Sequence, residues 1–142
     1  MNKHAEEFKK YLAVKGITIF EIKEQGDEAH TTIFISHMVV AGQQLPTIVI
    51  TDDSVFTIIR VQIALEVLTP ENELTLLKMV DEINRDYKLL KMYFDAAGSL
   101  YLDASIVTFE RELSGDEVYF IFNVILDYLN ENYKKIMQTL WN

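Results

Sequence analysis

The sequence has no cysteine, and only two prolines and five glycines among its 142 residues. Without cysteine the chain can form no disulfide bond, no thiolate metal site and no cysteine nucleophile. The few prolines and glycines do not gather into a low-complexity stretch that could separate two domains. We therefore expect residues 1–142 to form a single domain, which is long enough to bury a core without covalent cross-links.

Long apolar runs are absent as well. The longest of them, residues 118–122, has five residues, whereas a membrane-spanning helix needs roughly 20. The first ten residues are rich in charge and lack the apolar stretch of a secretory signal. These features predict a cytoplasmic protein with no membrane partner.

Positive charge is scarce, because 13 Lys and Arg stand against 22 Asp and Glu, giving a formal net charge of −9. Nucleic-acid backbones and anionic membranes attract basic proteins, so this composition disfavours both as partners. The basic residues are also spread over several predicted helices and do not form one patch. We expect no nucleic-acid partner.

Residues that could carry catalysis do not converge in the sequence. No pair among His4, His30 and His37 has the spacing of a helical zinc site, and no glycine-rich phosphate loop or Gly-x-Ser-x-Gly motif occurs. The adjacent carboxylates Asp52 and Asp53 are typical of a tight turn, where they hydrogen-bond the backbone of the turn. We predict no catalytic residue, no metal ligand and no cofactor, and hence a non-enzymatic protein.

Helical periodicity occurs first over residues 3–14, where Ala5, Phe8 and Leu12 recur on one side. Gly16 follows at a position that suits a left-handed helix end. The period then changes to two and β-branched residues dominate, which predicts strands. The four predicted strands are residues 17–22, 31–38, 45–51 and 55–68. Because the gaps between them are short, we expect antiparallel hairpins.

A second helix is predicted to begin at Thr69 and Pro70, with Thr69 as the N-cap and Pro70 at the first helical position. Its predicted apolar stripe comprises Leu76, Val80, Ile83, Tyr87 and Leu90.

A hairpin follows, and the length of its turn sets its register. A three-residue loop at 96–98 puts Gly98 where a positive φ is required and aligns the apolar positions of both strands. The resulting pairs are Phe94 with Leu100, Met92 with Leu102, Tyr93 with Tyr101 and Lys91 with Asp103. In this register we expect Asp103 at the surface, paired with Lys91.

The last helix has a clear start, because Ser114 and Glu117 match a capping box and Leu113 and Val118 stand where a hydrophobic staple belongs. Ten of the twelve residues 118–129 are apolar, so this helix must be covered on more than one side. The simpler explanation is a central position against the sheet. The alternative is that part of its surface contacts another subunit or a client protein.

The C-terminal end of this helix carries Trp141, which we expect to pack on its own domain or, in the alternative, on a partner. The candidate partner-contact residues of the last helix are Phe120, Val124, Tyr128, Tyr133, Leu140 and Trp141.

The element order is α-β-β-β-β-α-β-β-α, which predicts an α+β two-layer sandwich of helices on an antiparallel sheet. Over almost the whole chain this order resembles the YbjN family of bacterial sensory transduction regulators, most sharply at residues 82–88 and 91–103. The resemblance implies a fold like that of the type III secretion chaperones. The predicted strand at 55–68 departs from that pattern, because it is longer than a minimal chaperone sheet requires.

The resemblance implies a partner-binding, chaperone-like or regulatory module, often dimeric, and carries no catalytic signature. We therefore predict a protein-interaction module that binds a protein client, or a second copy of itself, through apolar surface on the sheet or the last helix. The alternative is a small-molecule-binding protein or an enzyme with a weak sequence signal. Its pocket would lie between sheet and helices, with Asp52, Asp53 or Asp103 at the mouth.

Overall fold

The structure is a computed structural model that describes residues 1–141. Its elements follow the predicted order and class. The helices are α1 (Lys3–Lys15), α2 (Glu73–Asp86) and α3 (Gly115–Leu140). The strands are β1 (Glu21–Glu24), β2 (Thr32–Val40), β3 (Gln43–Thr51), β4 (Phe56–Ala64), β5 (Leu90–Phe94) and β6 (Leu100–Val107). All of these strands join in one antiparallel sheet with the order β1-β2-β3-β4-β6-β5.

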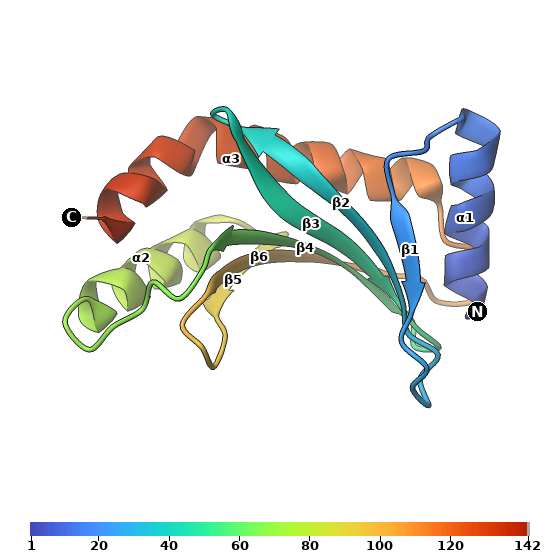
Figure 1. The fold of residues 1–142 in the computed structure, drawn as a ribbon, viewed down its shortest axis with the longest axis horizontal. Coiled ribbons are helices and arrows are strands. Elements are labelled where there is room, and N and C mark those ends of the chain that lie inside the picture. The colour runs from blue at the N-terminus through green and yellow to red at the C-terminus, as the bar shows by residue number, and fades with distance from the viewer. Residues whose placement is uncertain (142) are drawn as a thin grey trace.

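The longest helix, α3, lies across one face of this sheet, and α1 covers the same face at one end (Figure 1). The N–H of Glu117 donates to the hydroxyl oxygen of Ser114, as the capping box predicts. Ile125 and Leu129 point inward and are fully buried. Because α3 contacts β2, β6, α1 and α2, the predicted central position of this helix is confirmed.

The first helix is fixed at both of its ends. Asn2 is its N-cap: the side-chain oxygen accepts from the N–H of Ala5, while the side-chain nitrogen donates to the carbonyl of His30. Gly16 ends the helix with a φ of 66°, as predicted. Between the ends, Phe8 is fully buried and its ring lies edge-on to that of Phe34 on β2, with centroids 4.9 Å apart.

The hairpin register worked out from the sequence is confirmed pair by pair, from Lys91 opposite Asp103 to Phe94 opposite Leu100. Gly98 has a φ of 82°, and the N–H of Asp95 donates to the carbonyl of Ser99. The three-residue turn therefore sets this pairing as expected.

Two strand predictions were wrong. The first strand is Glu21–Glu24 and not 17–22, because residues 17–20 lead from α1 to the sheet without pairing. The fourth strand ends at Ala64 and not at residue 68. A register shift separates Gln62 from Ala64, and Glu66 then takes a left-handed backbone with a φ of 46°. The predicted departure from a minimal chaperone sheet rested on residues 65–68, which lie outside the strand.

The predicted start of the second helix was also wrong, because Asn72 and not Thr69 precedes its first turn. The side chain of Asn72 accepts from the N–H of Thr69 and donates to the carbonyl of Val67, which holds residues 69–72 as a separate turn. The helix ends at Asp86, so Tyr87 and Leu90 lie outside it, and Leu90 begins β5.

Among residues 1–141, no helix combines the length and the apolar character needed to cross a bilayer.

Candidate functional site

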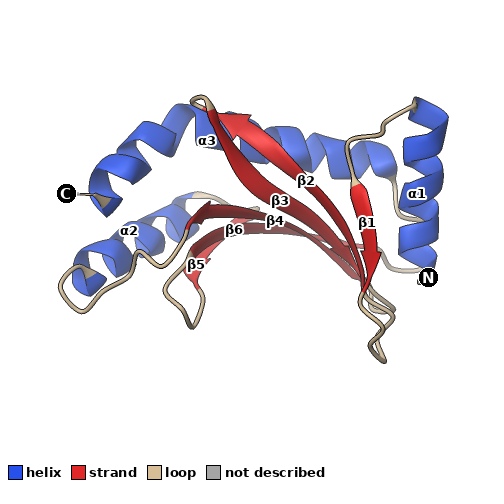
Figure 2. Cartoon of the chain, in the orientation of Figure 1, coloured by secondary structure: helices blue, strands red, loops and turns tan. Residues whose placement is uncertain are grey.

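The two faces of the sheet have very different surroundings. The helices pack on one face, and the other face has no helix over it (Figure 2). Along β3, Leu45, Thr47 and Val49 are buried on the helical side, whereas Ile48 and Ile50 alternate with them and keep part of their surface in solvent. The same alternation holds for β2 and β4.

We call this uncovered side the open sheet face. Its members on the central strands are Ile33, Ile35, His37, Val39, Gln44, Pro46, Ile48, Ile50, Phe56, Ile58, Arg60 and Gln62, and those on the remaining paired strands are Glu21, Lys23, Lys91, Tyr93, Tyr101, Asp103, Ser105 and Val107. Most of these side chains are aliphatic or aromatic. A broad uncovered apolar surface of this kind is typical of an interaction site.

The strand register aligns these residues in rows across the sheet. In the central row, Ile35 of β2 lies opposite Ile48 of β3, and Ile48 lies opposite Arg60 of β4. Arg60 in turn lies opposite Asp103 of β6, and Asp103 opposite Lys91 of β5. At the other end of the row, Glu21 of β1 lies opposite Ile35. The row therefore carries aliphatic side chains between charged groups within one continuous surface.

Arg60 and Asp103 form a two-pronged ion pair. The Arg60 Nε donates to Asp103 Oδ1 at 2.9 Å and the Nη2 to Oδ2 at 3.0 Å. The Tyr93 hydroxyl donates to the same carboxylate, 3.1 Å from Oδ2. Asp103 is only 5% exposed although it lies on the open sheet face. The expectation that Asp103 faces solvent beside Lys91 was therefore wrong, because Arg60 on the other neighbouring strand takes it.

Two tyrosine rings support the guanidinium of this pair. The rings of Tyr93 and Tyr101 are stacked, with centroids 5.9 Å apart, and the Arg60 guanidinium carbon lies 5.8 and 6.0 Å from their centroids. The Tyr101 hydroxyl donates to the side-chain oxygen of Gln62 at 3.4 Å. These contacts hold Arg60 in a fixed orientation on the sheet.

The ionisation of these groups follows from their surroundings. Burial, and then the nearby Asp103 carboxylate, raise the pKa of Tyr93 to about 12. The hydrogen bonds to Asp103 raise the pKa of the Arg60 guanidinium above its ordinary value. At neutral pH the phenol therefore keeps its proton and donates, and the guanidinium stays charged.

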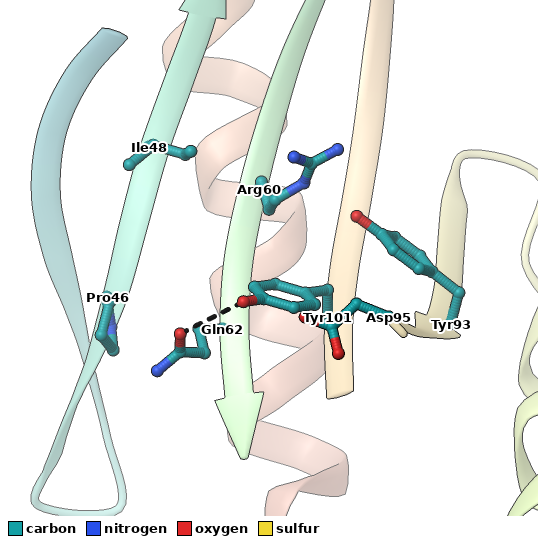
Figure 3. Close-up of a pocket in the computed structure, with 7 residues that line it drawn as sticks. All are labelled: Pro46, Ile48, Arg60, Gln62, Tyr93, Asp95 and Tyr101. Atoms are coloured by element: carbon teal, nitrogen blue, oxygen red, sulfur yellow. Dashed lines mark hydrogen bonds between the residues drawn. The ribbon is translucent and has the colours of Figure 1, made fainter. Parts of the chain in front are cut away.

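Next to this cluster the open sheet face is hollowed. The hollow has a volume of about 460 Å³, and Figure 3 shows its lining: Pro46, Ile48, Arg60, Gln62, Tyr93, Asp95 and Tyr101. Its walls combine two aromatic rings, aliphatic side chains and a small number of polar groups. Apolar walls with a few polar groups are typical of a site that binds a ligand.

The sequence did not single out these residues. Arg60 and Asp103 are 43 positions apart, and no local pattern indicates that β4 pairs with β6. One signal was available. The strands carry isoleucine on both of their faces, whereas an antiparallel strand with one face in solvent normally alternates apolar and polar residues.

The candidate contact residues on α3 divide by exposure. Phe120 is 67% exposed and Trp141 is 69% exposed. Val124 and Tyr133 are half-buried, whereas Tyr128 and Leu140 are buried within the domain. The expectation that Trp141 packs on its own domain was wrong.

Two hollows lie beside these residues. One, of about 450 Å³, is lined by Val124 and Tyr128 together with the segment 86–90. The other, of about 580 Å³, is lined by Tyr133 and Trp141 together with Ala41. The helix therefore presents two separate surfaces and not one.

The structure does not bring Asp52, Asp53 and Asp103 together. Asp52 Oδ1 accepts from the N–H of Ser54 at 2.8 Å, the turn role predicted for it. Asp53 pairs with His30, which lies in the loop before β2. Asp103 has Arg60 and Tyr93 as partners. The small-molecule alternative expected one of these three carboxylates at the mouth of a pocket between sheet and helices, and the structure places none of them there.

Together these features define a class: a two-layer α+β domain whose helices cover one side of an antiparallel sheet and leave an apolar side uncovered. The chain belongs to the YbjN family, described as "Putative bacterial sensory transduction regulator", whose model matches residues 4–137. The predicted family is thereby confirmed. No curated protein shows significant sequence similarity to the chain.

Among solved structures, the chain is similar to one in the crystal structure of the ExsC–ExsE complex. The similarity covers 92% of this chain and 96% of that chain, with a TM-score of 0.57 and 13% sequence identity. At this identity the likeness shows the fold alone. It agrees with the predicted architecture of six strands and three helices.

Proposed function

We propose that this protein is a non-enzymatic, cytoplasmic protein-interaction module of the secretion-chaperone-like type, and that it binds an extended segment of a partner protein on the open sheet face. The observation that carries the proposal is the row of aliphatic side chains, among them Ile35 and Ile48, on a side of the sheet that no helix covers. Apolar area removed from water contributes about 25 cal/mol per Å², so covering these residues favours binding.

Two further findings support this proposal. The carboxylate of the cluster is not available to a substrate, since Asp103 is bonded to Arg60 and Tyr93 and is buried. One similar solved structure is that of a complex between ExsC and ExsE. Both findings are consistent with a protein that binds a partner chain and not a metabolite or a nucleic acid.

A test begins with a phage-displayed library of random 12-residue peptides selected on the purified protein. The variant Ile48→Glu places a charge in the middle of the open sheet face. Val14→Glu is the matched control, because Val14 is an aliphatic residue of α1 that is 76% exposed and lies away from this face. We expect selected peptides to bind wild type and Val14→Glu equally, and to lose affinity for Ile48→Glu at least tenfold.

The same variants apply to proteins captured from an extract of the native host and identified by mass spectrometry. A partner retained by Val14→Glu and lost with Ile48→Glu supports the proposal. A partner or peptide that binds all three proteins equally uses another surface, and the open sheet face is then not the binding site.

We also propose that a second copy of the chain covers the exposed part of α3. Phe120 projects into solvent one turn before Val124, which lines the hollow of about 450 Å³. When two copies of α3 approach antiparallel about a twofold axis, each Phe120 lies near the hollow of the other copy. A knob and a hollow on the same helix are therefore self-complementary, and they favour a homodimer.

A further inference from the structure

The ion pair on the open sheet face has an inaccessible negative end and an accessible positive end. Both oxygens of Asp103 are occupied by Arg60 and by the Tyr93 hydroxyl, and the side chain of Asp103 is 7% exposed. The side chain of Arg60 is 31% exposed. A bound segment can therefore reach the guanidinium but not the carboxylate.

Arg60 also keeps unused donors. A guanidinium has five N–H groups, and Asp103 receives one from Nε and one from Nη2. The Nη1 nitrogen donates to no residue between 1 and 141 in the hydrogen-bond network of the structure. Because Asp103 and two tyrosine rings already hold the group in place, little side-chain entropy is lost when it binds a ligand.

The polar groups of the hollow differ between its two ends. Gln62 accepts from the Tyr101 hydroxyl through its oxygen, which leaves its amide nitrogen as a donor. Asp95 lies on the side of the Tyr101 ring away from the guanidinium (Figure 3), and its Oδ1 accepts from the N–H groups of Ala97 and Ser99. At the Arg60 end, the groups left for a ligand are donors beside apolar walls.

We propose that Arg60 is the anchor for an acidic side chain, Asp or Glu, of the bound segment, with neighbouring aliphatic residues of that segment on Ile48 and Ile35. The inference rests on the proposed function and names the chemistry of its partner. Carboxylates are the natural ligands of a fixed guanidinium edge, since two parallel N–H groups match two oxygens. Near Arg60 the net charge of −9 does not oppose this binding, because the buried Asp103 is matched by Arg60 and exposed Lys91 lies opposite Asp103. The acidic residue of the row, Glu21, lies at its far end, opposite Ile35.

The experiment uses peptides obtained by selection on wild-type protein, with counter-selection on Ile48→Glu. Each peptide is resynthesised with every Asp or Glu replaced in turn by Asn or Gln, and dissociation constants are measured by fluorescence polarisation. We expect one acidic position whose amide variant binds about tenfold more weakly, as the loss of a charge-assisted hydrogen bond implies.

The second arm changes the protein. Removing Arg60 alone leaves Asp103 buried and unpaired, so the variant used is the double change Arg60→Gln with Asp103→Asn, whose folding is verified by circular dichroism. In this variant the acidic peptide and its amide counterpart should bind equally well. Val14→Gln, at an exposed position of α1 away from the open sheet face, is the control and should keep the tenfold preference.

Each outcome decides between the two proposals. Selected peptides without an acidic residue, an amide replacement without effect, or an acid preference that persists in the double variant would each overturn the Arg60 anchor while leaving the open sheet face as the binding site. A library that yields no peptide sensitive to Ile48→Glu contradicts the proposed function itself, and the anchor fails with it.

Discussion

The side-chain amide of Asn84 forms hydrogen bonds with both the backbone N–H and the backbone carbonyl of Met92. The Asn84 oxygen accepts from the Met92 N–H at 2.7 Å, and the Asn84 nitrogen donates to the Met92 carbonyl at 2.9 Å. Met92 belongs to β5, which is an edge of the sheet. The end of α2 therefore occupies hydrogen-bonding groups that an edge strand otherwise offers to another chain.

The first prediction concerns this contact. Asn84→Ala leaves the N–H and carbonyl of Met92 unpaired, and we expect it to lower the free energy of unfolding by about 1–3 kcal/mol. It should also increase self-association through β5. Urea denaturation measures the first effect and light scattering at rising concentration the second. Asn123→Ala, at an exposed position of α3, should change neither; equal effects of both variants contradict the role of Asn84.

Local features of the fold could be predicted from the sequence. The register of the hairpin at 91–103 was predicted to the residue, because the length of a turn and alternating side chains determine the register locally. The start of α3 was predictable for the same reason, since Ser114 and Glu117 are three residues apart. Both features depend on contacts within a few residues.

The features that were missed depend on distant contacts. The fourth strand was predicted to continue to residue 68, as its β-branched residues suggest. In the structure the N–H groups of Glu66, Val67 and Leu68 donate instead to Ser99 and Gly98 of the β5–β6 turn. These bonds turn the chain away from the sheet, and no local sequence pattern predicts them.

The candidate site was missed for the same physical reason. The sequence predicted an ion pair between Asp103 and Lys91, and Lys91 does lie opposite Asp103 on β5. The Asp103 side chain pairs instead with Arg60 on the other neighbouring strand, because the guanidinium offers two donors in a fixed geometry. Choosing between two neighbours requires the strand order, which follows from the fold of the whole chain.

The second prediction concerns Gly115, the first residue of α3. A Cβ atom at this position would lie 2.0 Å from Cγ of Tyr11, so the ring must move if glycine is replaced. In an open helix, alanine in place of glycine is favourable by about 1 kcal/mol. Here we expect Gly115→Ala to destabilise by about 1–3 kcal/mol, as overpacking does.

Removal of the ring provides the control for this prediction. With Tyr11→Ala in the background, the added methyl group meets no ring, and Gly115→Ala should cost little or become favourable. Chemical denaturation of the four proteins gives the coupling between the two positions. Additive effects of the two substitutions would show that the helices α1 and α3 do not meet through this contact.

The third prediction concerns alkaline pH. Tyr93 and Tyr128 have pKa values raised to about 12, chiefly by burial, whereas a tyrosine in an unfolded chain titrates near 10. The folded state therefore holds these protons more tightly. The stability that they contribute is fully present below pH 10 and is lost as the pH rises from about 10 to 12.

We expect the free energy of unfolding, measured with urea between pH 8 and 11.5, to fall more steeply with pH in wild type than in Tyr93→Phe or Tyr128→Phe. Absorbance at the phenolate band should show late titration that each substitution removes in part. An unchanged slope in both variants would contradict the raised pKa values of these phenols.

The last prediction tests the proposed homodimer. Phe120→Ser removes the exposed ring from α3 at little cost to folding, because that ring is 67% exposed. We expect wild type to sediment as a dimer at micromolar concentration, and Phe120→Ser to sediment as a monomer with unchanged circular dichroism. Val14→Ser removes an exposed aliphatic side chain from α1 and should remain dimeric. A wild-type protein that stays monomeric at high micromolar concentration would contradict the proposed homodimer, and so would a dimer that survives Phe120→Ser. Neither result bears on binding at the open sheet face, because the two surfaces share no residue.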